Sequence, residues 1–95
     1  MNSFVKCERW IVHGRVQRVG FRYFSMRSAR RWDVGGAARN RSDGTVEIVA
    51  VGTADALSGF YREISKGPSL ASVVDIMREP AEYTEIDFDS FDIVF

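Results

Sequence analysis

Hydrophobic and polar positions alternate along the first part of the chain and then recur with a helical period. Residues 6–13 place Trp10 and Val12 on one side of an alternating segment, which predicts a β-strand that ends at Gly14. A helix is predicted over residues 21–32, which contain neither Gly nor Pro and bring four positions close to one helical face: Phe21, Phe24, Ser28 and Trp32.

The middle of the chain predicts a hairpin and a second helix. Two segments, 37–41 and 45–51, flank the turn sequence Ser42-Asp43-Gly44, and Val46, Ile48 and Ala50 share one face of the second. Glycines 35 and 36 mark the preceding break. Thr53 is a suitable N-cap for a helix that ends at Gly67-Pro68 and has an apolar stripe of Ala54, Leu57, Phe60, Tyr61 and Ile64. Residues 73–78 predict another strand, and so does the alternating tail with Ile86, Phe88, Phe91, Ile93 and Phe95.

The order of these elements is β-α-β-β-α-β with a short extra strand at the C-terminal end. Two helices can cover only one face of the mainly antiparallel sheet that this order produces, so we expect an α+β ferredoxin-like sandwich. At 95 residues the chain is too short to divide into two viable cores, and a single domain over residues 1–95 is expected. This fold is used for many unrelated functions, so the function must be argued from the site.

Composition and charge narrow the classes of function. Thirteen basic residues balance thirteen acidic ones, and a net charge of zero gives no overall attraction to nucleic acid or acidic membranes. One cysteine, Cys7, and one histidine, His13, are too few for a cysteine-based metal site, so we expect neither a metal nor a cofactor. We found no leader sequence or apolar span, and expect a monomer in the reducing cytosol.

The segment Val12–Arg22 has the layout of an anion-binding loop. It connects the end of an apolar strand to a helix through two glycines and three arginines. Unpaired backbone N–H groups at a helix N-terminus carry partial positive charge, and a guanidinium beside them can bind two oxygens of one phosphate. A small phosphorylated ligand is therefore the first hypothesis.

Two blocks of this sequence resemble the signatures of the acylphosphatases. GRVQRVGFR at 14–22 and GGAARNRSDGTVEI at 35–48 are similar to the family forms V-x-G-x-V-Q-G-V-x-F-R and G-aromatic-small-x-N-x-x-x-G-x-V. The likeness extends over nearly the whole chain and includes the order of elements. Two separated blocks on the expected elements make the resemblance specific.

The resemblance implies hydrolysis of a carboxyl-phosphate anhydride to a carboxylate and inorganic phosphate, without a metal. It implies that Arg22 binds the phosphoryl group and that Asn40 holds the attacking water. The loop that it implies around the phosphoryl group consists of Arg15, Val16, Gln17, Arg18, Val19, Gly20, Phe21 and Arg22. A carboxylate leaves without protonation, so positioning and electrostatics can suffice. The expected partners are a small acyl phosphate and inorganic phosphate, with no nucleic acid or membrane.

Several of these residues also have a structural interpretation. Asn40 could be a strand-end residue that satisfies the hairpin turn with its side chain, and Gln17 could be a loop spacer or a ligand contact. His13 is expected to be a packed strand-end residue. Two residues depart from the family pattern: Arg18 stands where glycine is usual, and Ala37 stands where an aromatic residue is usual.

Two other functions fit parts of the sequence. A non-catalytic domain that senses a phosphorylated ligand would retain the loop if Arg18 blocked catalysis. An RNA-binding module of the same topology would use the basic and aromatic residues of segment 18–24, but those aromatics are predicted to begin a helix rather than to face solvent on a strand.

Overall fold

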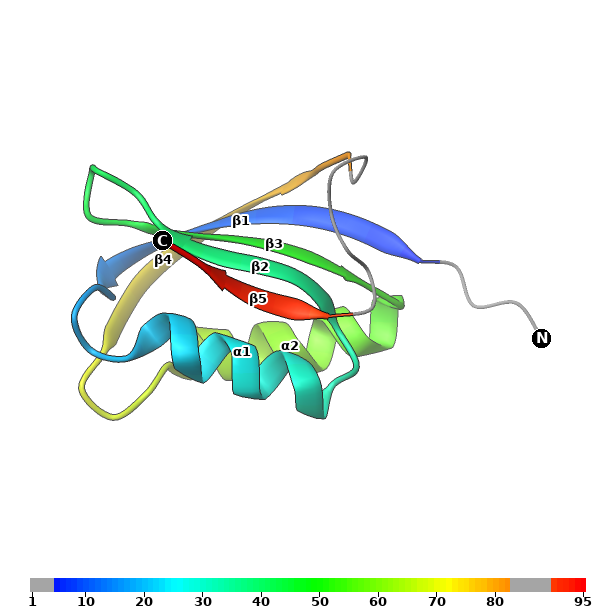
Figure 1. Ribbon diagram of the computed structural model, residues 1–95, viewed down its shortest axis with the longest axis horizontal. Coiled ribbons are helices and arrows are strands. Elements are labelled where there is room, and N and C mark those ends of the chain that lie inside the picture. The colour runs from blue at the N-terminus through cyan, green and yellow to red at the C-terminus, as the bar shows by residue number, and fades with distance from the viewer. Residues whose placement is uncertain (1–4, 83–89) are drawn as a thin grey trace.

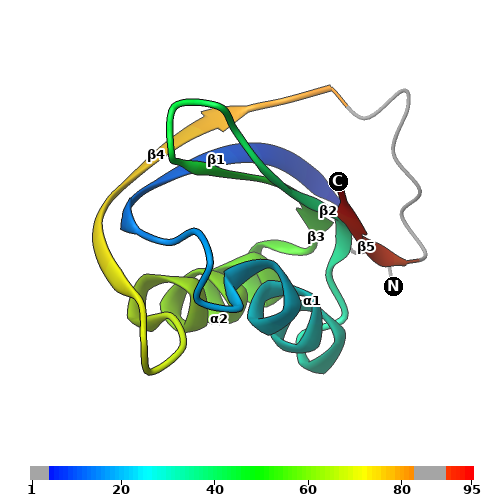
Figure 2. The same cartoon turned by 60° about the vertical axis from the view of Figure 1, so that its left-hand side comes forward.

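The protein folds as two layers, a five-stranded sheet with two helices packed on one of its faces (Figures 1 and 2). The computed structural model describes residues 5–82 and 90–95. In chain order the elements are β1 Lys6–Arg15, α1 Phe21–Arg31, β2 Gly35–Asn40, β3 Val46–Gly52, α2 Ala54–Lys66, β4 Ser72–Pro80 and β5 Phe91–Val94. The expected ferredoxin-like α+β sandwich is confirmed. The tail positions Ile86 and Phe88 lie outside the described residues.

The strands lie in the order β4-β1-β3-β2-β5, and each neighbouring pair is antiparallel except β2 and β5, which are parallel. The β2–β5 register pairs Ala38 with Ile93 and Arg39 with Val94. The last residues of the chain therefore lie beside the end of β2, next to Asn40.

Glycines 35 and 36, expected as a break, instead form the beginning of β2. Gly36 has φ of +128°, and a Cβ at this position would lie 1.8 Å from the carbonyl oxygen of Val49 on β3. Only glycine permits this close approach of two backbones, so the residue maintains the β2–β3 pairing that ends at Asn40.

The core lies between the helices and the sheet and is rich in aromatic side chains. Trp10 of β1, Phe60 of α2 and Phe91 of β5 are buried, and the Phe60 ring lies 5.3 Å from Trp10 and 5.7 Å from Phe91. Thr53 accepts a hydrogen bond at 3.1 Å from the Ala56 N–H, which confirms it as the N-cap of α2. The packing of these aromatic side chains holds the helices on the sheet.

The face of the sheet without helices carries a row of alternating charges. Arg9 on β1 lies 3.0 Å from Glu47 on β3 and 3.2 Å from Glu79 on β4, and Arg39 on β2 also pairs with Glu47. These ion pairs keep the uncovered face of the sheet polar.

Candidate active site

A pocket of about 160 Å³ opens at the end of the molecule where three segments meet. These segments are the loop from β1 to α1, the β2–β3 turn and the end of β5, all seen on the left of Figure 1. The residues that line the pocket are Val16, Arg18, Gly20, Phe21, Arg22, Tyr23, Asn40, Ile93 and Phe95.

The N-terminus of α1 forms one wall of this pocket. Gly20 precedes the helix in the left-handed conformation, at φ of 77°, and its carbonyl accepts the first helical hydrogen bond from Phe24 at 2.9 Å. No side chain caps this end, and the first turn contains no acidic residue. Among the residues that the structure describes, the N–H groups of 17–23 have no hydrogen-bond acceptor. These unpaired donors at the positive end of a helix can bind a phosphoryl group.

Arg22 projects from the first turn of α1 and is held there by β5. Its Nη1 donates to the Val94 carbonyl at 3.1 Å, and its Cζ lies 4.8 Å from the centre of the Phe95 ring. A guanidinium has five N–H donors in a planar fork, so this contact leaves donors available for phosphate oxygens. The β5 contacts reduce the number of positions that the side chain can adopt.

Asn40 is the last residue of β2, and its side chain lines the pocket without a hydrogen-bond partner in the described part of the chain. The adjacent turn is satisfied by other groups. The Asp43 carboxylate accepts from Thr45 N–H at 3.0 Å and from the Thr45 hydroxyl at 2.5 Å, and the hydroxyl, followed by the N–H, lowers the pKa of Asp43. The turn therefore does not use the Asn40 amide, which remains available to a ligand.

Gln17 joins the β1–α1 loop to the hairpin. Its side-chain amide nitrogen donates to the carbonyl oxygens of Arg41 at 2.8 Å and Thr45 at 2.9 Å. Two hydrogen bonds across 24 and 28 residues restrict movement between the loop and the strand end that presents Asn40. The Gln17 side chain thus contacts the hairpin and does not line the pocket.

The structure brings together most, but not all, of the residues expected at the site. Arg15 is exposed at the end of β1, and Val19 is half-buried against the core, so neither lines the pocket. Ala37 lies three positions before Asn40 on the same strand, which places it on the opposite face of the sheet. His13, expected to be packed, is exposed, because it faces the uncovered side of the sheet beside a bulge at Gly14.

Three lining residues are absent from the sequence-based prediction: Tyr23, Ile93 and Phe95. Tyr23 directly follows the first signature block, and Ile93 and Phe95 alternate along the tail. No local pattern indicates that this tail pairs in parallel with β2. Segment 18–24 lies in the loop and in α1, and not on a central strand as an RNA-recognition surface requires.

Arg18 adopts a left-handed backbone conformation at the position where the family pattern has glycine. Its φ is 63°, and its exposed side chain lines the pocket with no partner among the described residues. A non-glycine residue in this conformation costs on the order of 1 kcal/mol. The loop thus retains its left-handed turn at the expense of some strain.

For the acyl phosphate hydrolysis that the resemblance implies, we expect Arg18→Gly to raise kcat/KM by about two- to fivefold, because relief of strain lets the N–H donors adjust to a phosphoryl group. Thermal unfolding should show equal or slightly higher stability. Steady-state kinetics at two ionic strengths test this. A marked loss of activity that shrinks as salt increases would show instead that the guanidinium attracts substrate.

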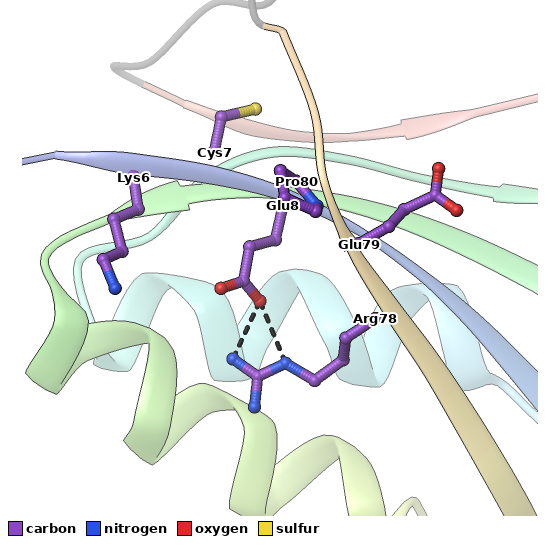
Figure 3. Close-up of a pocket in the computed structure, with 6 residues that line it drawn as sticks. All are labelled: Lys6, Cys7, Glu8, Arg78, Glu79 and Pro80. Carbon is purple, nitrogen blue, oxygen red and sulfur yellow. Dashed lines mark hydrogen bonds and ion pairs between the residues drawn. The ribbon is translucent and has the colours of Figure 1, made fainter.

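A second hollow, of about 380 Å³, lies at the β1–β4 edge of the sheet and has different properties (Figure 3). In it Arg78 donates from Nε and Nη2 to the Glu8 carboxylate at 2.9 and 2.8 Å, and Trp10 Nε1 donates to the same oxygen at 2.7 Å. The Glu8 and Arg78 charges that face this hollow are paired with each other, and Glu79 pairs with Arg9 outside it. Its lining residues belong to β1 and β4, so it lacks the helix N-terminus found beside α1.

The Glu8 carboxylate predicts a pH-dependent contribution to stability. Burial acts to raise the pKa of Glu8, but the hydrogen bonds from Trp10 and Arg78 outweigh it and hold the pKa below its usual value. A lowered folded-state pKa contributes stability above the unfolded value of about 4.3, and this contribution is lost as pH falls through the folded value. We expect Glu8→Gln to lower the free energy of unfolding by about 1–2 kcal/mol at pH 7.

Urea unfolding at neutral and strongly acidic pH measures this effect, with the exposed Glu82→Gln as the matched control. The difference between Glu8→Gln and the parent should shrink as the carboxylate becomes protonated. An unchanged difference at both pH values would contradict a charge-dependent interaction.

The described ranges, 5–82 and 90–95, contain neither a cluster of metal-binding side chains nor a helix that could span a membrane. No group of three or more His, Cys, Asp or Glu side chains is placed to hold a metal ion. Neither α1 nor α2 is long and apolar enough to cross a membrane.

Sequence comparisons identify relatives over nearly the full length of this chain. The Acylphosphatase family model matches residues 8–93. An acylphosphatase of Bacillus licheniformis is 46% identical over 88 residues, which are 92% of this chain and 96% of that protein. An acylphosphatase of Pasteurella multocida is 40% identical over 87 residues, or 90% of this chain and 94% of that protein.

Solved structures with the same fold include members of the same family. The crystal structure of acylphosphatase from Bacillus subtilis superimposes with a TM-score of 0.87 at 38% identity and covers 97% of this chain and 100% of that one. A full-length HypF, in a phosphate- and nucleotide-bound form, matches with a TM-score of 0.89 at 29% identity over 100% of this chain and 12% of its own.

Proposed function

The chain belongs to the acylphosphatase family, and on that premise we propose how its own residues hydrolyse the carboxyl-phosphate bond without a metal ion. The observation that supports the proposal best is that one pocket contains the unpaired N–H groups of the α1 terminus, the Arg22 guanidinium and the unpartnered Asn40 amide. The family establishes the class of reaction, and this pocket supports the assignment of roles.

The loop and Arg22 bind the phosphoryl group. Its three non-bridging oxygens retain negative charge through the transfer, and fixed N–H donors with a guanidinium stabilise that charge without reorganisation. The leaving group is a carboxylate, whose conjugate acid has a pKa of about 4, so it departs without protonation. The absence of a general acid from the proposed residues is therefore consistent with this substrate.

Asn40 positions the water. Its side-chain carbonyl can accept a hydrogen bond from a water molecule whose oxygen faces phosphorus opposite the leaving oxygen. As the bond between this oxygen and phosphorus forms, the bond from phosphorus to the acyl oxygen breaks with its electron pair. A neutral amide is too weak a base to take the water's proton, so a non-bridging phosphate oxygen receives it.

We expect hydrolysis of benzoyl phosphate to proceed at the same rate in the presence of a strong chelator, with inorganic phosphate as a competitive inhibitor. Binding by N–H groups and an arginine requires no metal, and free phosphate presents the same oxygens as the substrate. Initial rates with and without chelator, and at several phosphate concentrations, measure both properties.

Two results would contradict this mechanism. Activity abolished by chelator and restored by zinc or magnesium would assign the chemistry to a metal. Rapid hydrolysis of unactivated alkyl phosphate monoesters would also contradict it, because their alkoxide leaving group needs a proton donor that the proposed site does not contain.

We also propose that residues 1–95 form one acylphosphatase-like domain and that it acts in a reducing compartment such as the cytosol. The matched range of 8–93 supports the first statement. Cys7, a free and buried thiol whose pKa burial raises, supports the second, because the described residues contain no disulfide.

A further inference from the structure

The phosphate-binding pocket continues into an apolar wall that the loop does not account for. Beyond the loop and Asn40, its remaining lining residues are Tyr23, Ile93 and Phe95. Tyr23 comes from the first turn of α1. Ile93 lies in β5 and Phe95 directly follows that strand, whose end lies at the same end of the molecule (Figure 1). Two elements distant in sequence thus form one side of the pocket.

Two of these side chains expose an unusual amount of aromatic surface. Phe95 is 98% exposed and Tyr23 is 56% exposed, whereas the aromatic side chains of the core are fully buried. An apolar ligand that covers exposed apolar area beside a binding pocket removes this area from water, which favours binding. A ligand with an apolar group next to the phosphoryl position should therefore bind more tightly at this site.

The Phe95 ring is adjacent to the phosphate-binding arginine itself. Arg22 Cζ lies 4.8 Å from the ring centre, and the same guanidinium donates to the Val94 carbonyl. A single oxygen atom joins the phosphorus of an acyl phosphate to its carbonyl carbon. A substrate whose phosphoryl group binds Arg22 therefore has its acyl group within reach of this ring.

We propose that Tyr23, Ile93 and Phe95 form an acyl-binding subsite that selects substrates with flat, apolar acyl groups over small or charged ones. This inference rests on the proposed function, because it assumes that the phosphoryl group binds at the α1 terminus. No carboxylate lines the described pocket, so a cationic acyl group has no partner there. Arg18 is the group that could favour an anionic acyl chain instead, and the test separates that possibility.

Binding of two non-hydrolysable anions tests the subsite independently of catalysis. Methylphosphonate and phenylphosphonate share a phosphonate group and differ in the apolar substituent. Calorimetry should show phenylphosphonate binding at least about threefold more tightly. Phe95→Ala should weaken phenylphosphonate about three- to tenfold while methylphosphonate changes less than about twofold. Val74→Ala, an exposed apolar residue on the opposite edge strand β4, is the matched control and should change neither.

Kinetics distinguish this inference from the proposed function. Phe95→Ala should raise KM for both substrates by different factors. The factor for benzoyl phosphate should be about three to ten times the factor for acetyl phosphate. If the protein binds phenylphosphonate preferentially but hydrolyses neither substrate, the subsite stands and the proposed function is overturned. Hydrolysis of both substrates with equal binding of the two phosphonates would overturn the subsite alone.

Three further results would overturn the subsite. Equal losses for both phosphonates in Phe95→Ala would show that the ring acts only by positioning Arg22. Tighter binding of phosphonoacetate than of phenylphosphonate, removed by Arg18→Gly, would show selection of an anionic acyl group. A failure of the protein to bind any of the phosphonates would overturn the phosphate-binding loop together with its subsite.

Discussion

Arg22→Ala is expected to lower kcat/KM for acyl phosphates by about 10³–10⁵-fold, the range found for arginines that stabilise phosphoryl transfer. In the proposed mechanism the guanidinium contacts phosphate oxygens in both the bound substrate and the transition state, so binding of inorganic phosphate should weaken in parallel with turnover. Steady-state kinetics and phosphate inhibition constants measure the two effects.

The control variants separate the charge from the geometry of Arg22. Arg22→Lys retains one positive charge but loses the planar fork and should recover only part of the activity. Arg30→Ala removes an exposed arginine from the last turn of the same helix and should leave kcat/KM unchanged. An Arg22→Ala protein with normal phosphate inhibition would show that the N–H groups bind the anion alone.

Asn40→Ala is expected to lower kcat by about 10²–10³-fold, equivalent to about 3–4 kcal/mol of transition-state stabilisation. In the proposed mechanism the amide contacts the water rather than the phosphoryl group, so the inhibition constant of inorganic phosphate should remain close to its original value. The two mutants should therefore differ in phosphate affinity, although both lose turnover.

The hairpin provides the control for Asn40. Its turn is held by Asp43 and Thr45, so Asn40→Ala should unfold at nearly the same temperature as the parent. Ser42→Ala, an exposed change two residues later, should retain full activity. Full activity in Asn40→Ala would show that the residue serves only the strand end.

Local sequence patterns predicted most of the fold because each depends on residues close in the chain. The uninterrupted stretch that begins at Phe21 predicted α1, and Thr53 predicted the start of α2, since periodicity and capping act within a few residues. Glycines 35 and 36 were misleading in isolation. Their role depends on the approach of Val49 from the neighbouring strand, which no local pattern specifies.

The candidate site was predictable to the extent that its residues lie in contiguous blocks. The segment from Val16 to Arg22 surrounds one helix N-terminus, so its chemistry follows from the order of residues. Gln17 was ambiguous, because its contacts with Arg41 and Thr45 join segments more than twenty residues apart. Its assignment as a link to the hairpin required the three-dimensional structure.

The amino-acid sequence by itself determined most of the elements, the loop proposed to bind the anion and the identity of the groups proposed for chemistry. Tertiary structure decided which of these groups share a pocket. The parallel pairing of β2 with β5 brings Phe95 and Asn40 into one pocket and the Val94 carbonyl against Arg22. That pairing joins strands separated by half the chain, and its register depends on the packing of the whole sheet, whereas periodicity records only which face each side chain occupies.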